Sequence, residues 1–177
     1  LTTTATAGNK VYDGSAAAAT SLSLTGLVTR LGQTDNVTVA STTSVYSDKN
    51  VGVNKTVTAS GLSLNGTDAA NYSLASTSVS ATGSIIKKDL TVTYTASDKV
   101  YDGTTAAGVT GSSNNIVTGD VVTFTQTAAF ADKTAATGKT VSISSIALGG
   151  TDATNYNLTA NTVTLTVRAS GLDPWTY

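Results

Sequence analysis

Two short motifs carry the side chains of this sequence that are best suited to chemistry, and each motif occurs twice. The first joins a phenol, a carboxylate and a glycine, at Tyr12, Asp13, Gly14 and again at Tyr101, Asp102, Gly103. A tyrosine ring can stack on a sugar and an aspartate can accept hydrogen bonds from its hydroxyls, so a ligand site is one interpretation. We favour a structural one, in which Tyr packs on the core, Asp closes an Asx-type turn and Gly supplies a positive φ. Motifs repeated in tandem copies serve the shared fold first.

The second motif ends in an asparagine followed by a tyrosine. These pairs are Asn71, Tyr72 and Asn155, Tyr156. We interpret each pair as the exit from a turn followed by a core tyrosine, whose hydroxyl needs a hydrogen-bond partner when it is buried. The residues of both motifs are therefore expected to be structural, and none is expected to be catalytic or to bind a cofactor or metal.

Two other kinds of site are conceivable around the second motif. Asp68 and Asp152 lie in its glycine-rich turns, where calcium is a candidate ligand. Calcium needs six to eight oxygen ligands at spaced positions, and the sequence has no alternating run of aspartates, so we expect no metal. A covalent bond from Lys49 or Lys133 to the asparagine of the motif, helped by the nearby aspartate, is a second hypothesis.

The missing residue types restrict catalysis. The chain has no His and no Cys, and all its acidic residues are Asp. Thiol, disulfide and zinc–thiolate chemistry is excluded, and the commonest general base is missing. A nucleophile would need an unusual Ser–Lys or Asp–Asp pair, so we expect neither an enzyme nor a cofactor.

Charge and hydropathy exclude two further classes of protein. Charged residues make up 12% of the chain and the net charge is -1, which does not provide the basic face of a nucleic-acid-binding protein. No apolar run approaches the roughly 20 residues that a membrane-spanning helix requires. We therefore expect no nucleic-acid partner and no membrane insertion.

The elements that must position these motifs are predicted to be β-strands. Apolar residues alternate with Thr or Ser in many stretches, for example from Leu90 to Tyr94, as expected of strands with one buried face. Gly, Asn and Asp stand between these stretches and favour turns. We predict an all-β protein of two tandem, small, Ig-like β-sandwich modules arranged end to end. A β-grasp-like fold is the alternative, but it needs a helix and no stretch has a helical period.

The spacing of the repeated motifs indicates one insertion. Tyr101 follows Tyr12 by 89 residues, whereas Tyr156 follows Tyr72 by 84. The first copy is therefore longer between its two motifs, and an insertion that leaves the flanking patterns intact belongs in a loop.

Module boundaries follow from the repeat. We place the first module at residues 1–86, the second at 87–168, and a tail or the start of a further module at 169–177. Because the chain contains no Met, we expect it to be a segment of a longer polypeptide. Ile85 and Ile86 at the junction are expected to be buried and to make the pair a semi-rigid rod.

With both motifs in view, the sequence resembles a known family. The segment Lys99–Ala106 is similar to the signature of the YDG domain, and Gly66–Leu74 and Gly150–Leu158 resemble its second signature. The resemblance covers nearly all of Leu1–Arg168, as two copies. It implies tandem modules of a large secreted bacterial protein, similar to adhesins of the filamentous-haemagglutinin type, with no catalytic residues to carry over.

This resemblance sets the functional expectation. The modules would act as a stalk or spacer in adhesion or biofilm formation, outside the cell or on the bacterial surface. The alternative is an adhesive module that binds a glycan or another host-surface ligand, but aromatic residues make up only 6% of the chain. Expected partners are neighbouring modules of the same polypeptide, and host or matrix glycans or proteins. The two-module chain itself is expected to be monomeric. Glucosylation of asparagine is a further hypothesis, and the sequons are at Asn36, Asn54, Asn65, Asn71 and Asn157.

Overall fold

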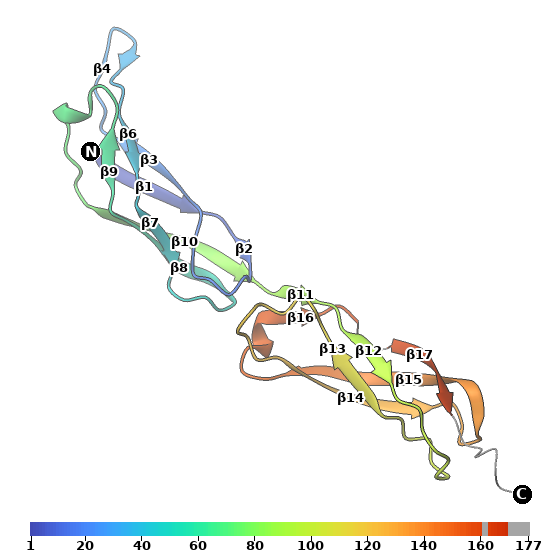
Figure 1. The fold of residues 1–177 in the computed structure, drawn as a ribbon. Helices are drawn as coiled ribbons and strands as arrows, with labels where there is room; N and C mark the ends of the chain where they lie inside the picture. The colour runs from blue at the N-terminus through green and yellow to red at the C-terminus, as the bar shows by residue number, and fades with distance from the viewer. Residues whose placement is uncertain (161–162, 170–177) are drawn as a thin grey trace, which may run out of the picture. The chain divides into compact units, whose positions relative to one another are not determined.

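The chain folds into two compact units. The computed structural model describes residues 1–160 and 163–169 (Figure 1). The units are Leu1–Lys88 and Asp89–Tyr177, called module 1 and module 2 below, and each is described by itself. Of the predicted C-terminal segment 169–177, all but Ala169 lies outside the described residues.

Module 1 consists of short strands in small sheets. Its strands are β1 (Thr2–Ala7), β2 (Lys10–Val11), β3 (Thr20–Thr25), β4 (Thr29–Arg30), β5 (Gln33–Thr34), β6 (Thr38–Ala40), β7 (Thr43–Tyr46), β8 (Gly52–Ser60), β9 (Ser63–Asn65) and β10 (Ser78–Ile86). β1 pairs with β3, whereas β2 is an edge of the four-stranded sheet β2-β10-β8-β7. The N-terminal segment thus passes from one sheet to the other, as in an Ig-like β-sandwich.

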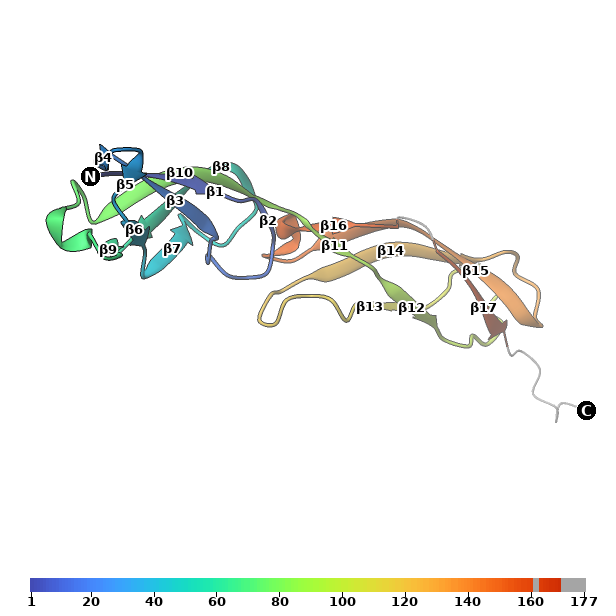
Figure 2. The same cartoon turned by 90° about the horizontal axis from the view of Figure 1, so that it is seen from above.

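Module 2 repeats much of this plan, and its longest strand is β15 (Ala136–Gly149), with 14 residues. Its strands are β11 (Lys88–Leu90), β12 (Thr93–Ala96), β13 (Val109–Ser112), β14 (Thr123–Phe130), β15 (Ala136–Gly149), β16 (Tyr156–Leu158) and β17 (Val163–Ala169). β12 pairs with β13, β11 with β16, and β14-β15-β17 form a three-stranded sheet. β14 and β15 run side by side as one long antiparallel hairpin (Figure 2).

Period-two alternation gives each strand one inward face. In module 2, Tyr94, Phe130, Val141, Ile143 and Ile146 form the buried cluster. Val141 and Ile143 are two residues apart on β15 and therefore point to the same side. The register between β14 and β15 then shifts, and this bulge returns Ile146 to the inward face although it lies three residues after Ile143.

The protein is all-β, as predicted. Within the described residues, the only helical segments are two short 3-10 turns, η1 (Ala69–Asn71) and η2 (Ala153–Asn155). A β-grasp-like fold therefore has no helix to build on in this part of the chain.

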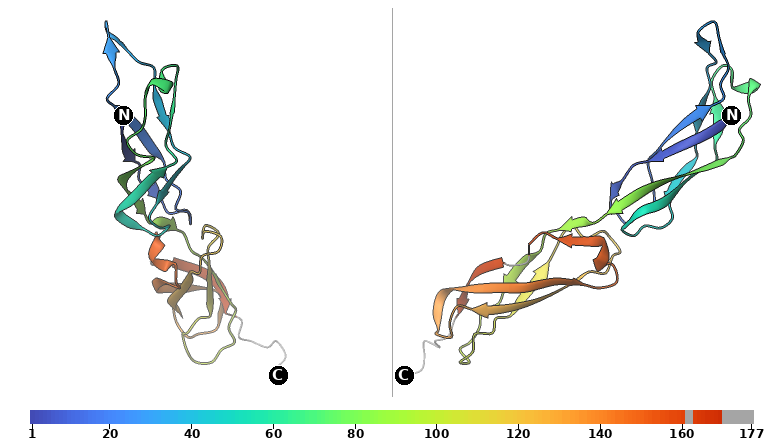
Figure 3. Two further views of the ribbon diagram at one scale, coloured as in Figure 1. Left: turned by 90° about the vertical axis from the view of Figure 1, so that its left-hand side faces the viewer. Right: turned by 180° about the vertical axis from the view of Figure 1, so that it is seen from behind.

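The modules differ most at a hairpin found in module 1. Seven positions separate Val28 from Asp35, but only three separate the corresponding Val117 and Asp120 of module 2. The additional residues form β4 and β5, which pair with each other around a turn at Leu31. This hairpin, coloured blue, projects from the body of module 1 (Figure 3). It lies in the region where the spacing of the motifs predicted a loop insertion.

Candidate functional site

The Tyr-Asp-Gly motif of module 1 closes an Asx turn. Asp13 Oδ1 accepts hydrogen bonds from the backbone N–H of Ser15 (2.9 Å) and from its hydroxyl (3.0 Å). The ammonium group of Lys10 donates to the same oxygen (2.7 Å). Gly14 has a φ of 80°, which glycine adopts without steric cost. The carboxylate is therefore engaged in holding its own loop.

The same geometry recurs in module 2. Asp102 Oδ1 accepts hydrogen bonds from the N–H (2.9 Å) and hydroxyl (2.8 Å) of Thr104, and it forms an ion pair with Lys99 (2.8 Å). Gly103 has a φ of 77°. The hydrogen bond from Lys99, followed by those from Thr104, lowers the pKa of Asp102 to about 2. Both copies of the motif thus serve as turns with an internal ion pair.

The tyrosines of this motif differ between the modules. Tyr12 is 1% exposed, and its N–H bonds the carbonyl oxygen of Ile86 (2.9 Å) next to the parallel pairing of β2 with β10. Tyr101, for which we also expected burial, is 56% exposed. Residues Lys99–Val100 form no strand corresponding to β2. Module 2 therefore presents at its surface an aromatic ring that module 1 does not.

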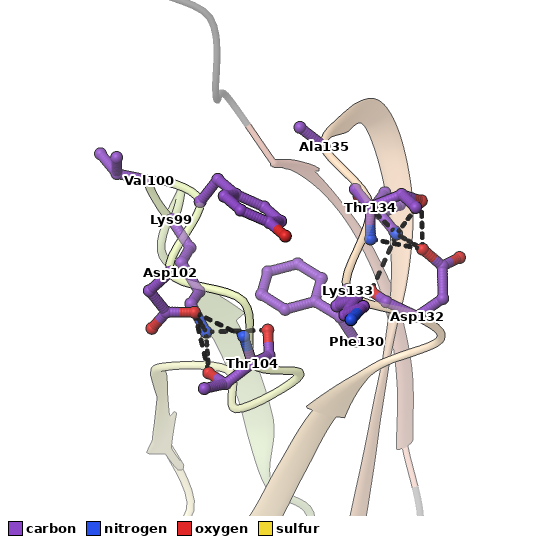
Figure 4. Close-up of a pocket in the computed structure, with 11 residues that line it drawn as sticks. Lys99, Val100, Asp102, Thr104, Phe130, Asp132, Lys133, Thr134 and Ala135 are labelled. Carbon is purple, nitrogen blue, oxygen red and sulfur yellow. Dashed lines mark hydrogen bonds and ion pairs between the residues drawn. The ribbon is translucent and has the colours of Figure 1, made fainter.

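Exposure of this ring coincides with a pocket in module 2. The pocket lies between the loop Lys99–Thr104 and the turn Asp132–Ala135. Phe130 lies between these two segments (Figure 4) and is itself largely buried. The pocket combines aromatic surface with charged rims, as ligand pockets often do.

A buried lysine organises one rim of the pocket. The ammonium group of Lys139, only 8% exposed as a residue, donates to the carboxylate of Asp132 and to the carbonyl oxygens of Asp132 (2.9 Å) and Thr134 (2.7 Å). The hydrogen bond from Lys139 is the main cause that lowers the pKa of Asp132 to about 2. In module 1, Lys55 bonds Asp48 in the same way (2.6 Å). These ion pairs hold the hairpin turns in shape.

The tyrosine of the second motif joins two loop residues in each module. Tyr72 donates its hydroxyl hydrogen to Asp35 Oδ2 (2.6 Å) and accepts a bond from the N–H of Val28 (3.0 Å). The bond to Asp35 raises the pKa of Tyr72. Tyr156 is similarly bonded to Asp120 Oδ2 (2.7 Å) and to the N–H of Val117 (2.8 Å).

Burial of the second motif again differs between the copies. Asn155 and Tyr156 are each 2% exposed, whereas Asn71 is exposed and Tyr72 half-buried. In both copies the asparagine ends the short 3-10 turn and the tyrosine follows it in extended conformation. The pair therefore leaves the turn as predicted from its position in the motif, while the burial of its side chains depends on the module.

The aspartates considered for calcium are bonded to backbone. Asp68 Oδ2 accepts the N–H of Asn36 (2.8 Å), and Asp152 Oδ2 accepts the N–H of Val121 (2.9 Å). In residues 1–160 and 163–169, no group of three or more His, Cys, Asp or Glu side chains is placed to hold a metal ion. The aspartates tie the 3-10 turns to the facing loop.

The hypothesis of a covalent bond between lysine and asparagine is wrong. Lys133 lies in the turn before β15, whereas Asn155 lies beyond the end of this strand of 14 residues. A rise of about 3.3 Å per residue separates the two side chains by roughly 40 Å. In module 1, β8 and β9 separate Lys49 from Asn71 in the same way. No amide bond can form across this distance.

Several partners of the motif residues were not expected from the sequence. Asp35 and Asp120 bond the motif tyrosines, and Lys10 and Lys99 bond the motif aspartates. Their signal was present, because each has a counterpart of the same residue type in the other copy. The exposed Leu31 at the tip of the inserted hairpin has no such signal, because the second copy lacks the hairpin.

Comparison with known proteins agrees with the repeated motifs. The family model of the YDG domain matches the chain twice, at residues 1–79 and 86–164. A search of curated proteins and a search of solved structures each gave no match. The two family matches together cover most of the chain and contain both motifs in both copies, so this protein belongs to the YDG domain family as a tandem pair of such domains.

Proposed function

We propose that the two modules are structural repeats of a large secreted bacterial surface adhesin, in which they act as a stalk or spacer during adhesion or biofilm formation. They would lie outside the cell or on its surface and would have no catalytic activity. The observation that carries this proposal is the use of the repeated polar residues. In both modules, the aspartates of the first motif, the tyrosines of the second motif and the turn lysines bond one another or nearby backbone.

Such internal bonding supports a structural function. A catalytic aspartate or lysine needs a free lone pair or an accessible proton directed at a substrate. Here the same bonds are made in both modules, and in each they close a turn. The described residues contain no helix that is both long and apolar enough to cross a membrane.

A module exchange in the parent adhesin tests the proposal. Replacing the pair with two unrelated Ig-like modules of similar length should leave the adhesion of cells unchanged, because a spacer contributes length rather than specific contacts. Deleting the pair should shorten the reach of the protein without changing which surface it binds. Loss of adhesion after the length-matched exchange would contradict the spacer function.

The second candidate function is binding of a glycan or host-surface ligand by module 2. The exposed ring of Tyr101 at the rim of the pocket favours it, because aromatic rings stack on the apolar faces of sugars. A glycan array probed with the two-module chain and with Tyr101→Ser distinguishes the candidates. Binding that the substitution abolishes would support the adhesive module, and no binding by either protein would support the spacer.

A further inference from the structure

The inserted hairpin of module 1 presents an apolar side chain in a strained backbone conformation. Leu31 has a φ of 52° and its side chain is fully exposed. The following Gly32 also has a positive φ, of 80°, so the tip is a two-residue turn of the kind that prefers Asn-Gly. Leucine is unfavourable here for both its conformation and its exposure. Residues with strained backbone cluster at sites of contact and function.

Module 2 offers a pocket of matching chemistry. It is lined by Phe130 and by Tyr101, which is 56% exposed, and Val100 (78% exposed) adjoins it on the same loop. The hollow is open to solvent, so an apolar side chain of another chain can pack against its aromatic lining. Exposed apolar surface beside a hollow is typical of protein interaction sites.

The exposed Leu31 at the hairpin tip is called the knob below. The charges beside the knob and around the pocket are complementary. Arg30 precedes Leu31 on the hairpin, and it forms no ion pair within residues 1–160 and 163–169. The pocket rim carries Asp102 and Asp132, whose Oδ1 atoms bind lysines while their side chains remain 52% and 57% exposed. Their outer oxygens can accept hydrogen bonds from a guanidinium group, which binds carboxylates in a planar, directional manner.

We infer that Leu31 of one chain inserts into the pocket of module 2 in a second copy of this chain, with Arg30 bonding the carboxylates of its rim. Knob and pocket are different surfaces, so the contact is heterologous and one chain can engage a partner at each. The interface is small, which makes it weak and transient. The chain is then monomeric when dilute, as expected from the sequence, and forms short head-to-tail oligomers when crowded on a surface. This inference goes beyond the proposed spacer function and does not depend on it.

Sedimentation velocity from micromolar to millimolar concentration tests the inference. The wild-type chain should show a sedimentation coefficient that rises with concentration. Leu31→Asn should weaken self-association on the order of 10-fold or more, because the buried leucine is lost. Asparagine tolerates a positive φ, so this variant keeps the hairpin, and its unfolding temperature should be equal or higher. Val100→Asp should weaken association similarly from the pocket side.

A mixture of the two variants gives the sharper result. Leu31→Asn keeps an intact pocket and Val100→Asp keeps an intact knob, so the equimolar mixture should form dimers but no longer species. A matched control, Val53→Asp, changes another exposed valine outside both surfaces and should associate like the wild type. Three outcomes would overturn the inference: a wild-type chain that stays monomeric at millimolar concentration, a Leu31→Asn variant that associates normally, or a mixture that stays monomeric.

Discussion

Lys139 offers the most direct test of how the module 2 turns are stabilised. In Lys139→Met the aliphatic part of the buried side chain is retained, but the ammonium group and its bonds to two carbonyl oxygens are lost. Asp132 is largely exposed, so water replaces its ion pair at little cost. The two carbonyl bonds decide the magnitude, because each hydrogen bond to a charged group contributes about 1.5–3 kcal/mol net, and removal of the desolvation cost of the buried ammonium group offsets part of their loss. We expect module 2 to lose about 2–3 kcal/mol of unfolding free energy, which lowers its transition by roughly 10–20 °C for a unit of this size.

Differential scanning calorimetry of the two-module chain measures this change. Lys139→Met should shift one transition and leave the transition of module 1 in place. Lys133→Met is the matched control, because Lys133 is exposed on the same turn, and its effect should stay within about 0.5 kcal/mol. If both variants shift the transition equally, the buried lysine does not stabilise the turn and the reasoning fails.

Three further predictions concern the same module. The folded pKa of about 2 for Asp102 and Asp132 lies below the ordinary 3.8. The two carboxylates therefore stabilise module 2 fully above about pH 5, and this contribution is lost as the pH falls from about 4 to 2. Acid unfolding followed by circular dichroism should lose this pH dependence when both residues are replaced by Asn. Gly150→Ala should cost more than about 2 kcal/mol in urea unfolding, because φ is 96° and the new Cβ would lie 2.3 Å from a backbone oxygen. The control Gly138→Ala, in open space with φ 71°, should cost only about 1 kcal/mol. Ser145 has a φ of 53°, so Ser145→Gly should relieve about 1 kcal/mol of backbone strain and thereby raise the thermal midpoint by several degrees. An unchanged midpoint would show that the bulge is unstrained.

Local features were predictable from the sequence, because short-range chemistry determines them. An aspartate followed by glycine and then by Ser15 or Thr104 can close an Asx turn whatever the rest of the chain does. The alternation around Val141 and Ile143 similarly predicts a strand with one buried face. Both depend on neighbours a few residues away.

Long-range features were not predictable, because they depend on topology. The hydroxyl of Tyr72 bonds Asp35, which is 37 positions away, because the fold brings the loops that contain these two residues together. The same cause explains the wrong cross-link, because only the observed path of β15 places Lys133 and Asn155 at opposite ends of a strand. Tyr12 and Tyr101 have the same flanking motif and yet differ in exposure, so the environment of the motif is not encoded within it.

The parallel pairing of β2 with β10 has a mechanical consequence. In module 1, Lys10 and Val11 lie beside Ile85 and Ile86 and run in the same direction. A pull that separates the two ends of the module draws these strands past each other along their length, so their hydrogen bonds are loaded in shear and must break together. Strands loaded from one end would instead unzip one bond at a time at lower force. Under tension, the short pairing therefore acts as a clamp whose rupture, rather than the equilibrium stability of the module, sets the lifetime of the fold.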